Sequence, residues 1–193
     1  NSPIRIMSDL IVDYLRQFGI DFVFGIPGGH IASFYEALER SKRDGGPRAI
    51  ISRHETGAVC MASGYTRETG KIGVCCATTS PGASNLLTGV AAAYADHDPI
   101  LVITAQTPLS RFGFAAFQES SPDIMDTTSM FNSCTRYNSI VTHPEQLERK
   151  LTTALTIALQ PPRGPVHLSI PIDIFKTPAP NPILYPNLLN LVS

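Results

Sequence analysis

The sequence predicts an α/β fold in which a doubly wound, roughly six-stranded parallel sheet carries helices on both of its faces. Three observations support this fold class. Short apolar segments with the composition of strands alternate with helical segments along almost the whole chain. Most strand segments are apolar without interruption, as in parallel sheets covered on both faces. Glycine, proline and polar residues gather after four of the strands, whereas the connections at the opposite end are ordinary.

The predicted helices have apolar residues three or four positions apart, and the first two end at Gly19 and at the pair Gly45-Gly46. The helices that begin near residues 54 and 82 are rich in small residues instead. In chain order, we expect helices at residues 7–19, 30–44, 54–70, 82–96, near 122–131 and at 144–160.

The predicted strands are short apolar runs bounded by glycine, proline or charged residues. In chain order, we expect strands at residues 21–26, 48–52, 71–79, 99–106, near 134–141 and at 164–171. Residues 106–121 form a long loop that interrupts the alternation, and such loops often carry function.

The domain organisation follows from where the alternation stops. Residues 1–175 are predicted to form one domain. Residues 176–193 contain four prolines and no periodicity, so they are predicted to be an extended, proline-rich linker. Because a linker at this end has to lead somewhere, we expect a further domain to follow in the natural protein.

Composition and charge exclude several functional classes. Hydrophobic residues make up 43% and charged residues 16% of the chain, which excludes a disordered protein. The net charge of -1 predicts no binding to nucleic acid or to an acidic membrane surface. We find neither a membrane-spanning run nor a signal peptide. The cysteines lack metal-ligand spacing, and three of the four lie in apolar runs, which predicts reduced core thiols and a cytoplasmic location.

Two glycine-proline motifs follow strands, at the edge where doubly wound sheets bind ligands. "GIPGGH", residues 25–30, fits neither a dinucleotide fingerprint nor a phosphate-binding P-loop, but its glycines would let the backbone approach a ligand closely. "TTSPGASN", residues 78–85, could hold an anion or a ring acceptor at a helix start. Either motif could equally be an ordinary turn or a helix cap.

Glu55 is the sharpest single feature, because one carboxylate begins a helix of small residues directly after a strand. It could simply complement the helix dipole. Alternatively, its small neighbours would let another protein surface bury it, and a buried carboxylate needs a partner such as a protonatable ring nitrogen. We expect no metal site, since His97 between Asp96 and Asp98 fits a helix end better.

Five segments, in this order and spacing, resemble the pyrimidine-binding (PYR) domain of thiamine-diphosphate-dependent enzymes of the acetolactate synthase-like family. They are "VFGIPGG", "RHETGAVCMASGYTRETGKIGVC", "TTSPGASNLLTGVAAAYADHDPILVITAQ", "AFQE" and "PRGPVHLSIPID". The resemblance extends from residue 3 to about residue 175. Ser80 and Ala105 stand where the family often has glycine, which leaves the substrate open.

The resemblance implies that Glu55 hydrogen-bonds a ring nitrogen of the cofactor's aminopyrimidine and thereby promotes loss of the thiazolium proton, after which the cofactor attacks a 2-keto acid. It also implies that Gln118 is catalytic, reaching towards the thiazolium side, and that Phe117 lines the substrate pocket. The cofactor-binding residues that it implies are Ile26, Pro27, Gly28, Gly29, Glu55, Thr78, Pro81 and Asn85.

The resemblance further implies a decarboxylase or carboligase in which this chain is one half of the site and is inactive alone. The diphosphate and Mg²⁺ would be bound by the pyrophosphate-binding domain of a second subunit, in a homodimer or homotetramer. FAD binds in some relatives. Small residues at 57–64 and 89–95 are compatible with a close interface between subunits. Three alternatives stay open: a non-catalytic regulatory or binding module, a generic nucleotide binder, and one subunit of a two-chain enzyme.

Overall fold

The computed structural model describes residues 4–180 and contains a six-stranded sheet in which every strand pairing is parallel. The strands are β1 (Phe22–Gly25), β2 (Arg48–Ile51), β3 (Gly73–Ala77), β4 (Ile100–Gln106), β5 (Tyr137–Ile140) and β6 (Val166–Pro171). Their spatial order is β2-β1-β3-β4-β6-β5, so the chain builds outward first on one side of β1 and then on the other. The predicted doubly wound sheet is therefore confirmed.

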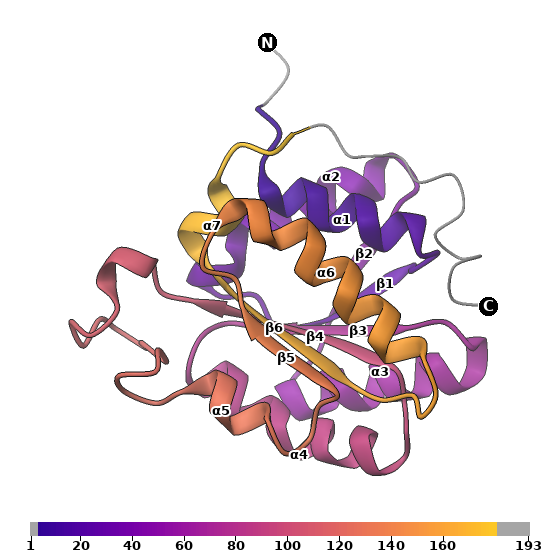
Figure 1. The fold of residues 1–193 in the computed structure, drawn as a ribbon. Helices are drawn as coiled ribbons and strands as arrows, with labels where there is room; N and C mark the ends of the chain where they lie inside the picture. The colour runs from indigo at the N-terminus through magenta and orange to yellow at the C-terminus, as the bar shows by residue number, and fades with distance from the viewer. Residues whose placement is uncertain (1–3, 181–193) are drawn as a thin grey trace.

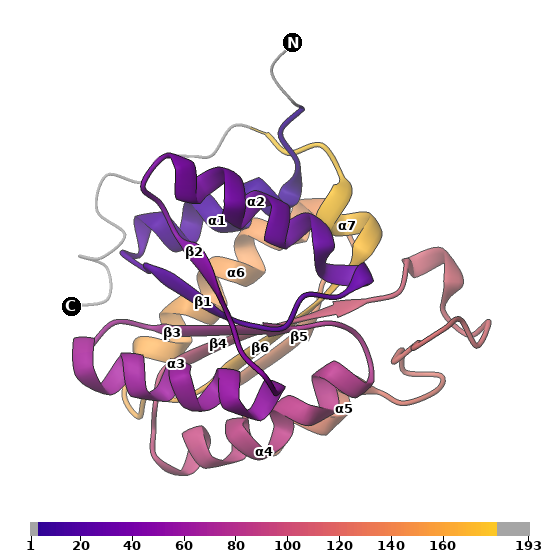
Figure 2. The same ribbon diagram turned by 180° about the vertical axis from the view of Figure 1, so that it is seen from behind.

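Helices cover both faces of this sheet, as predicted. They are α1 (Met7–Gln17), α2 (Ala32–Arg43), α3 (Glu55–Thr69), α4 (Pro81–Ala95), α5 (Thr127–Phe131), α6 (Pro144–Leu159) and α7 (Ile172–Lys176), with 3₁₀ turns η1 (Gly29–Ile31) and η2 (Leu109–Arg111). Figures 1 and 2 show α1, α2, α6 and α7 on one face, and α3, α4 and α5 on the other.

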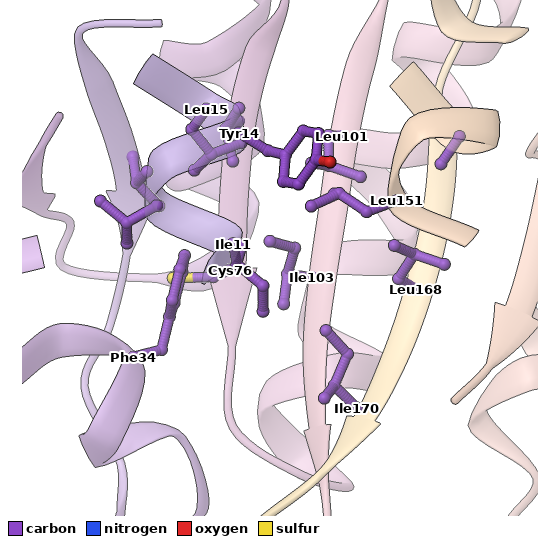
Figure 3. Close-up of a cluster of buried hydrophobic side chains, with 14 of the residues drawn as sticks. Ile11, Tyr14, Leu15, Phe34, Cys76, Leu101, Ile103, Leu151, Leu168 and Ile170 are labelled. Carbon is purple, nitrogen blue, oxygen red and sulfur yellow. The ribbon is translucent and has the colours of Figure 1, made fainter. Parts of the chain in front are cut away.

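The larger hydrophobic core lies between the sheet and the layer of α1, α2 and α6. Figure 3 shows Tyr14 of α1 and Leu151 of α6 beside Leu101 of β4. Phe34 of α2 lies farther along the sheet, near Cys76 of β3, and all these side chains are 0% exposed. Complete burial of an apolar side chain of this size stabilises the fold by about 1.5–3 kcal/mol. The apolar residues whose spacing predicts these helices therefore lie on the helix faces that are buried.

The second core lies on the other face and depends on small residues. A Cβ atom at Gly89 of α4 would lie only 2.6 Å from the Cβ of Val59 in α3, so glycine allows the two helices to pack closely. Part of the small-residue pattern in these helices therefore serves packing within the chain. Gly64 and Ala91 are exposed and remain available on the outer surface.

The sequence prediction was wrong in detail at three places. The helix expected near 122–131 covers only Thr127–Phe131, because Asp126 is extended and caps it by accepting the N–H of Ser129. A 3₁₀ turn, η1, precedes α2. The short helix α7 was not predicted, and it ends at Lys176, one residue beyond the expected domain boundary.

The segment after α7 stays attached to the domain for a few residues. Pro178 forms an antiparallel bridge with Ile6, and the N–H of Ala179 donates to the carbonyl of Arg5. The rest of the predicted linker, residues 181–193, lies outside the described residues. Within residues 4–180, no helix combines the length and apolar character needed to cross a bilayer.

A buried polar network joins the three neighbouring strands β4, β6 and β5. His167 is 0% exposed, its Nδ1 lies 2.7 Å from Asn138 Oδ1, and its Nε2 lies 2.8 Å from Thr104 Oγ1. Because the amide oxygen can only accept, Nδ1 carries the proton and Nε2 accepts from the threonine hydroxyl. Burial, with the ring of Phe131 4.3 Å away, lowers the pKa of His167 to about 3.

A turn with an unusual backbone joins β3 to α4. Ser80 has a φ of 43° and a ψ of −97°, a region in which the backbone of any residue other than glycine is strained. Its N–H donates to Ser120 Oγ at 3.3 Å, which fixes the turn against the long loop. The chain thus accommodates serine here at a cost, because its backbone angles are those that favour glycine.

Stability should fall between pH 7.5 and pH 5 because of His167. Its pKa is about 3 in the folded state and near 6.5 in the unfolded state, so only the unfolded chain binds a proton in this range. The stabilisation is complete well above the unfolded pKa of about 6.5, decreases as pH falls through that value, and is lower by about 2 kcal/mol at pH 5. Urea denaturation should show that His167→Gln removes this slope, whereas His97→Gln, on the surface, keeps it; equal slopes would contradict the assignment.

Ser80→Gly should stabilise the protein, because it removes the strain at positive φ and no side-chain hydrogen bond of Ser80 in the described part of the chain is lost. We expect the free energy of unfolding to rise by about 1 kcal/mol in chemical denaturation. Ser84→Gly, inside α4, is the matched control and should lower it by about 0.5–1 kcal/mol. Equal effects of the two substitutions would show that Ser80 is not strained.

Candidate active site

The candidate site lies at the edge where the strands β1 to β4 end. All these strands are parallel, so their carboxyl ends meet at one edge of the sheet. The segments that leave this edge are Ile26–Gly28, Ser52–His54, Thr78–Ser80 and the long loop 107–126. The four motifs singled out in the sequence are therefore neighbours in space.

Glu55 is the first residue of α3 and is half-buried. The helix starts here because His54 is extended and its Nδ1 accepts the N–H of Thr56 at 3.2 Å. Asn85 Nδ2 donates to Glu55 Oε2 at 3.0 Å, and the structure gives this carboxylate no ion pair within residues 4–180. One carboxylate oxygen is thus fixed by an amide, and the other has no hydrogen-bond partner in the same residues.

Two glycines pack closely against Thr78, and one of them also lies beside this free oxygen. A Cβ atom at Gly82 would be 3.6 Å from Glu55 Oε1 and 3.0 Å from Thr78 Cγ2. At Gly28, a Cβ would be 2.6 Å from Thr78 Cβ, which is too close for any other residue without movement. The structure therefore brings Gly28, Glu55, Thr78 and Asn85 together in one cluster, as the sequence had suggested.

Thr78 shows a further sign of a binding site. Its Oγ1 is buried but has no hydrogen-bond partner among residues 4–180. An unsatisfied buried hydroxyl is costly, and a bound ligand would supply the missing hydrogen bond. Of the neighbouring residues, Ile26 is half-buried and Pro27, Gly29 and Pro81 are exposed.

The long loop brings Gln118 to this edge but leaves Phe117 outside. Thr79 Oγ1 donates to Gln118 Oε1 at 3.5 Å, and Gln118 has a φ of 57°. Phe117 is 82% exposed, so none of residues 4–180 encloses it. The figures show the loop leaving the body of the domain beyond the end of β4.

Tyr35 and Cys76 are residues of the site that sequence reasoning missed. The thiol of Cys76 donates to the Tyr35 hydroxyl at 3.5 Å, and a Cβ at Gly25 would be 2.8 Å from that hydroxyl. Burial raises the pKa of Tyr35, and the charge of Glu55 adds to the effect. In the sequence, the only signal for Tyr35 is its position in the apolar pattern, which places it on the buried side of α2.

Within the described part of the chain, no group of three histidine, cysteine, aspartate or glutamate side chains could hold a metal ion. All four cysteines are free. Of the three in apolar runs, Cys75 and Cys76 are buried as predicted, but Cys60 is exposed, and the third buried thiol is Cys134, which lies in a polar segment.

Comparisons with known proteins agree with this geometry. Residues 6–130 match the family described as "Thiamine pyrophosphate enzyme, N-terminal TPP binding domain". The chain is 40% identical over 164 residues to an acetolactate synthase of Arthrospira platensis, and 42% identical over 164 residues to the acetolactate synthase isozyme 2 large subunit of Escherichia coli. These alignments cover 85% of this chain but only 28% of each relative.

A solved structure shows the same fold. The chain matches a putative thiamin diphosphate-dependent enzyme from Mycobacterium smegmatis with a TM-score of 0.82 and 28% identity, over 93% of this chain and 33% of that one. The chain thus spans less than a third of the length of the curated relatives quoted above. It belongs to the thiamine pyrophosphate enzyme family, as an N-terminal thiamine-pyrophosphate-binding (PYR) domain homologous to that of acetolactate synthase.

Proposed function

We propose that this chain is the cofactor-activating domain of an acetolactate synthase-like decarboxylase or carboligase that acts on 2-keto acids. The observation that carries the proposal is the state of Glu55: a half-buried carboxylate, fixed by Asn85 through one oxygen, whose other oxygen lies beside Gly82 and has no hydrogen-bond partner within residues 4–180. In such a place a carboxylate can share a proton with a ring nitrogen. The names of the relatives support the reaction class.

The residues present fit an aminopyrimidine ring. Gly28 and Gly82 both lie in close contact with Thr78, and the unpaired Thr78 Oγ1 would offer a hydrogen bond to a polar ring substituent. Ile26 and Pro27 would cover the ring, and Gly29 and Pro81 would border it. Thiamine diphosphate would supply a thiazolium carbon that, once deprotonated, adds to a 2-keto acid and accepts the electron pair left behind when carbon dioxide departs.

The contribution of the chain is to place and retain one proton. Glu55 would hold it between its carboxylate and the ring nitrogen, and Asn85 would keep the carboxylate oriented by its hydrogen bond of 3.0 Å. Water competes for such a bond, so the site has to be covered. Gln118 would reach over the pocket from the long loop, and Phe117 would become a wall of the substrate site once a second surface covers it.

We propose that this second surface is a pyrophosphate-binding domain of another subunit, which would also hold Mg²⁺ and the diphosphate in a homodimer or homotetramer. The exposure of Phe117, Pro27 and Pro81 supports this arrangement. The chain alone would then be inactive. Residues 176–193 would lead towards the next domain, and FAD, in an enzyme that binds it, would bind outside this chain. The free cysteines fit a reducing compartment such as the cytoplasm.

Glu55→Gln in the complete enzyme should reduce the turnover rate by about 100-fold or more, because an amide cannot share the proton. Thermal unfolding should stay unchanged. Glu68→Gln is the matched control, since Glu68 is an exposed residue of the same helix, and it should keep full activity. Turnover of Glu55→Gln within about twofold of the native rate would refute the proposed function.

Asn85→Ala should lower turnover about tenfold, because a hydrogen bond to a charged group contributes about 1.5–3 kcal/mol and here it orients Glu55. The neighbouring Ser84→Ala removes only a hydrogen bond to the carbonyl of Pro81 and should be nearly neutral. Steady-state kinetics of both variants in the complete enzyme decide the point. Native turnover in Asn85→Ala would mean that Glu55 is oriented by something else.

A further inference from the structure

The long loop contains a buried carboxylate that has no place in the reaction described above. Glu119 is only 4% exposed although it lies between β4 and α5, outside regular secondary structure. It forms no ion pair with any of residues 4–180. A buried carboxylate without a cation needs hydrogen-bond donors, and the loop itself supplies them.

Three donors from the same segment converge on Glu119. The N–H of Gly113 donates to Oε1 at 2.6 Å, the N–H of Ala116 donates to Oε2 at 3.0 Å, and the hydroxyl of Ser121 also donates to Oε1. The Ser121 hydroxyl, followed by the Gly113 N–H, lowers the pKa of the Glu119 carboxyl. The charged form is therefore the one around which residues 113–121 are folded.

The backbone of this segment would not keep its path without such support. Ala115 has a φ of 50° and Gln118 a φ of 57°, and each costs about 1–2 kcal/mol for a residue other than glycine. Gly113, with a φ of 78°, turns the chain at the start of the segment. The hydrogen bonds of Glu119 offset this strain at Ala115 and at Gln118 itself.

A second anchor lies immediately after Glu119. The N–H and the hydroxyl of Ser120 both donate to Gln106 Oε1, at 3.2 and 3.3 Å, and Ser120 Oγ accepts the N–H of Ser80. Gln106 ends β4 and Ser80 precedes α4, so Ser120 attaches the loop to the rigid edge of the sheet. Gln118 lies just before these two anchors, beside Thr79.

We propose that Glu119 is a positioning residue whose carboxylate shapes residues 113–121 and thereby holds the side chain of Gln118 at the edge of the Glu55 pocket. The destination of Gln118 rests on the proposed function. A neutral glutamine at position 119 cannot replace the carboxylate, because its single oxygen cannot serve both backbone donors and its NH₂ group would face one of them.

The first test is hydrogen exchange in the complete enzyme, which measures the protection of the loop's backbone amides independently of activity. Glu119→Gln should accelerate exchange of the amides in 113–118 by about tenfold or more. Asp126→Asn is the matched control, since Asp126 also accepts a backbone N–H, that of Ser129, at the other end of the same loop. It should leave exchange in 113–118 unchanged. Unchanged exchange in Glu119→Gln would overturn the proposal.

The second test is a double-mutant cycle on turnover. Glu119→Gln should lower kcat about tenfold in the native background but less than about twofold in the Gln118→Ala background, because it acts through Gln118. Equal losses in both backgrounds, or a Gln118→Ala variant with native turnover, would overturn the proposal. Ser121→Ala, which removes one donor and keeps the carboxylate, should change exchange in the same direction and by less, and serves if Glu119→Gln does not fold.

These outcomes separate the two proposals. Glu55→Gln depends on neither Gln118 nor Glu119. If it abolishes turnover while the cycle is additive, the positioning role fails and the proposed function stands. If Glu55→Gln retains native turnover, the proposed function fails, and the part of this inference that concerns Gln118 fails with it.

Discussion

A hydrogen bond of 3.0 Å between the amide of Asn85 and the carboxylate of Glu55 joins the first turns of α3 and α4, and the geometry of the pocket depends on it. Thr56 Oγ1 donates to the carbonyl of Asn85 at 2.6 Å and reinforces the same junction. The two helices can meet here only because their packing farther along is so close, with Gly89 against Val59. Small residues in the second core thus determine where the single acid lies.

The fold could be predicted because its signals are local. Continuous apolar runs such as the one that became β4, and the helical spacing that became α1, report directly which surfaces are buried. The motifs after the strands could also be placed, since parallel strands bring their carboxyl ends to one edge. The resemblance implied that Glu55 and Asn85 bind the same cofactor, but the hydrogen bond between them was not predicted.

The features that escaped prediction depend on contacts between distant residues or on backbone angles. The network of His167 joins residues from β4, β5 and β6, and nothing near His167 in the sequence signals it. Tyr35 reaches the site only through the packing of α2 on the sheet. The fold of the long loop depends on the carboxylate of Glu119, whereas composition indicated only that the loop exists.

The most direct test of the account is a crystal structure of the complete enzyme with thiamine diphosphate bound, in which the distances from the Glu55 carboxylate oxygens are measured. The account predicts that Oε1 lies about 2.6–3.2 Å from a ring nitrogen of the aminopyrimidine while Oε2 keeps its bond to Asn85. A ring that lies elsewhere, or a Glu55 carboxylate paired with a cationic side chain instead of the cofactor, would contradict it.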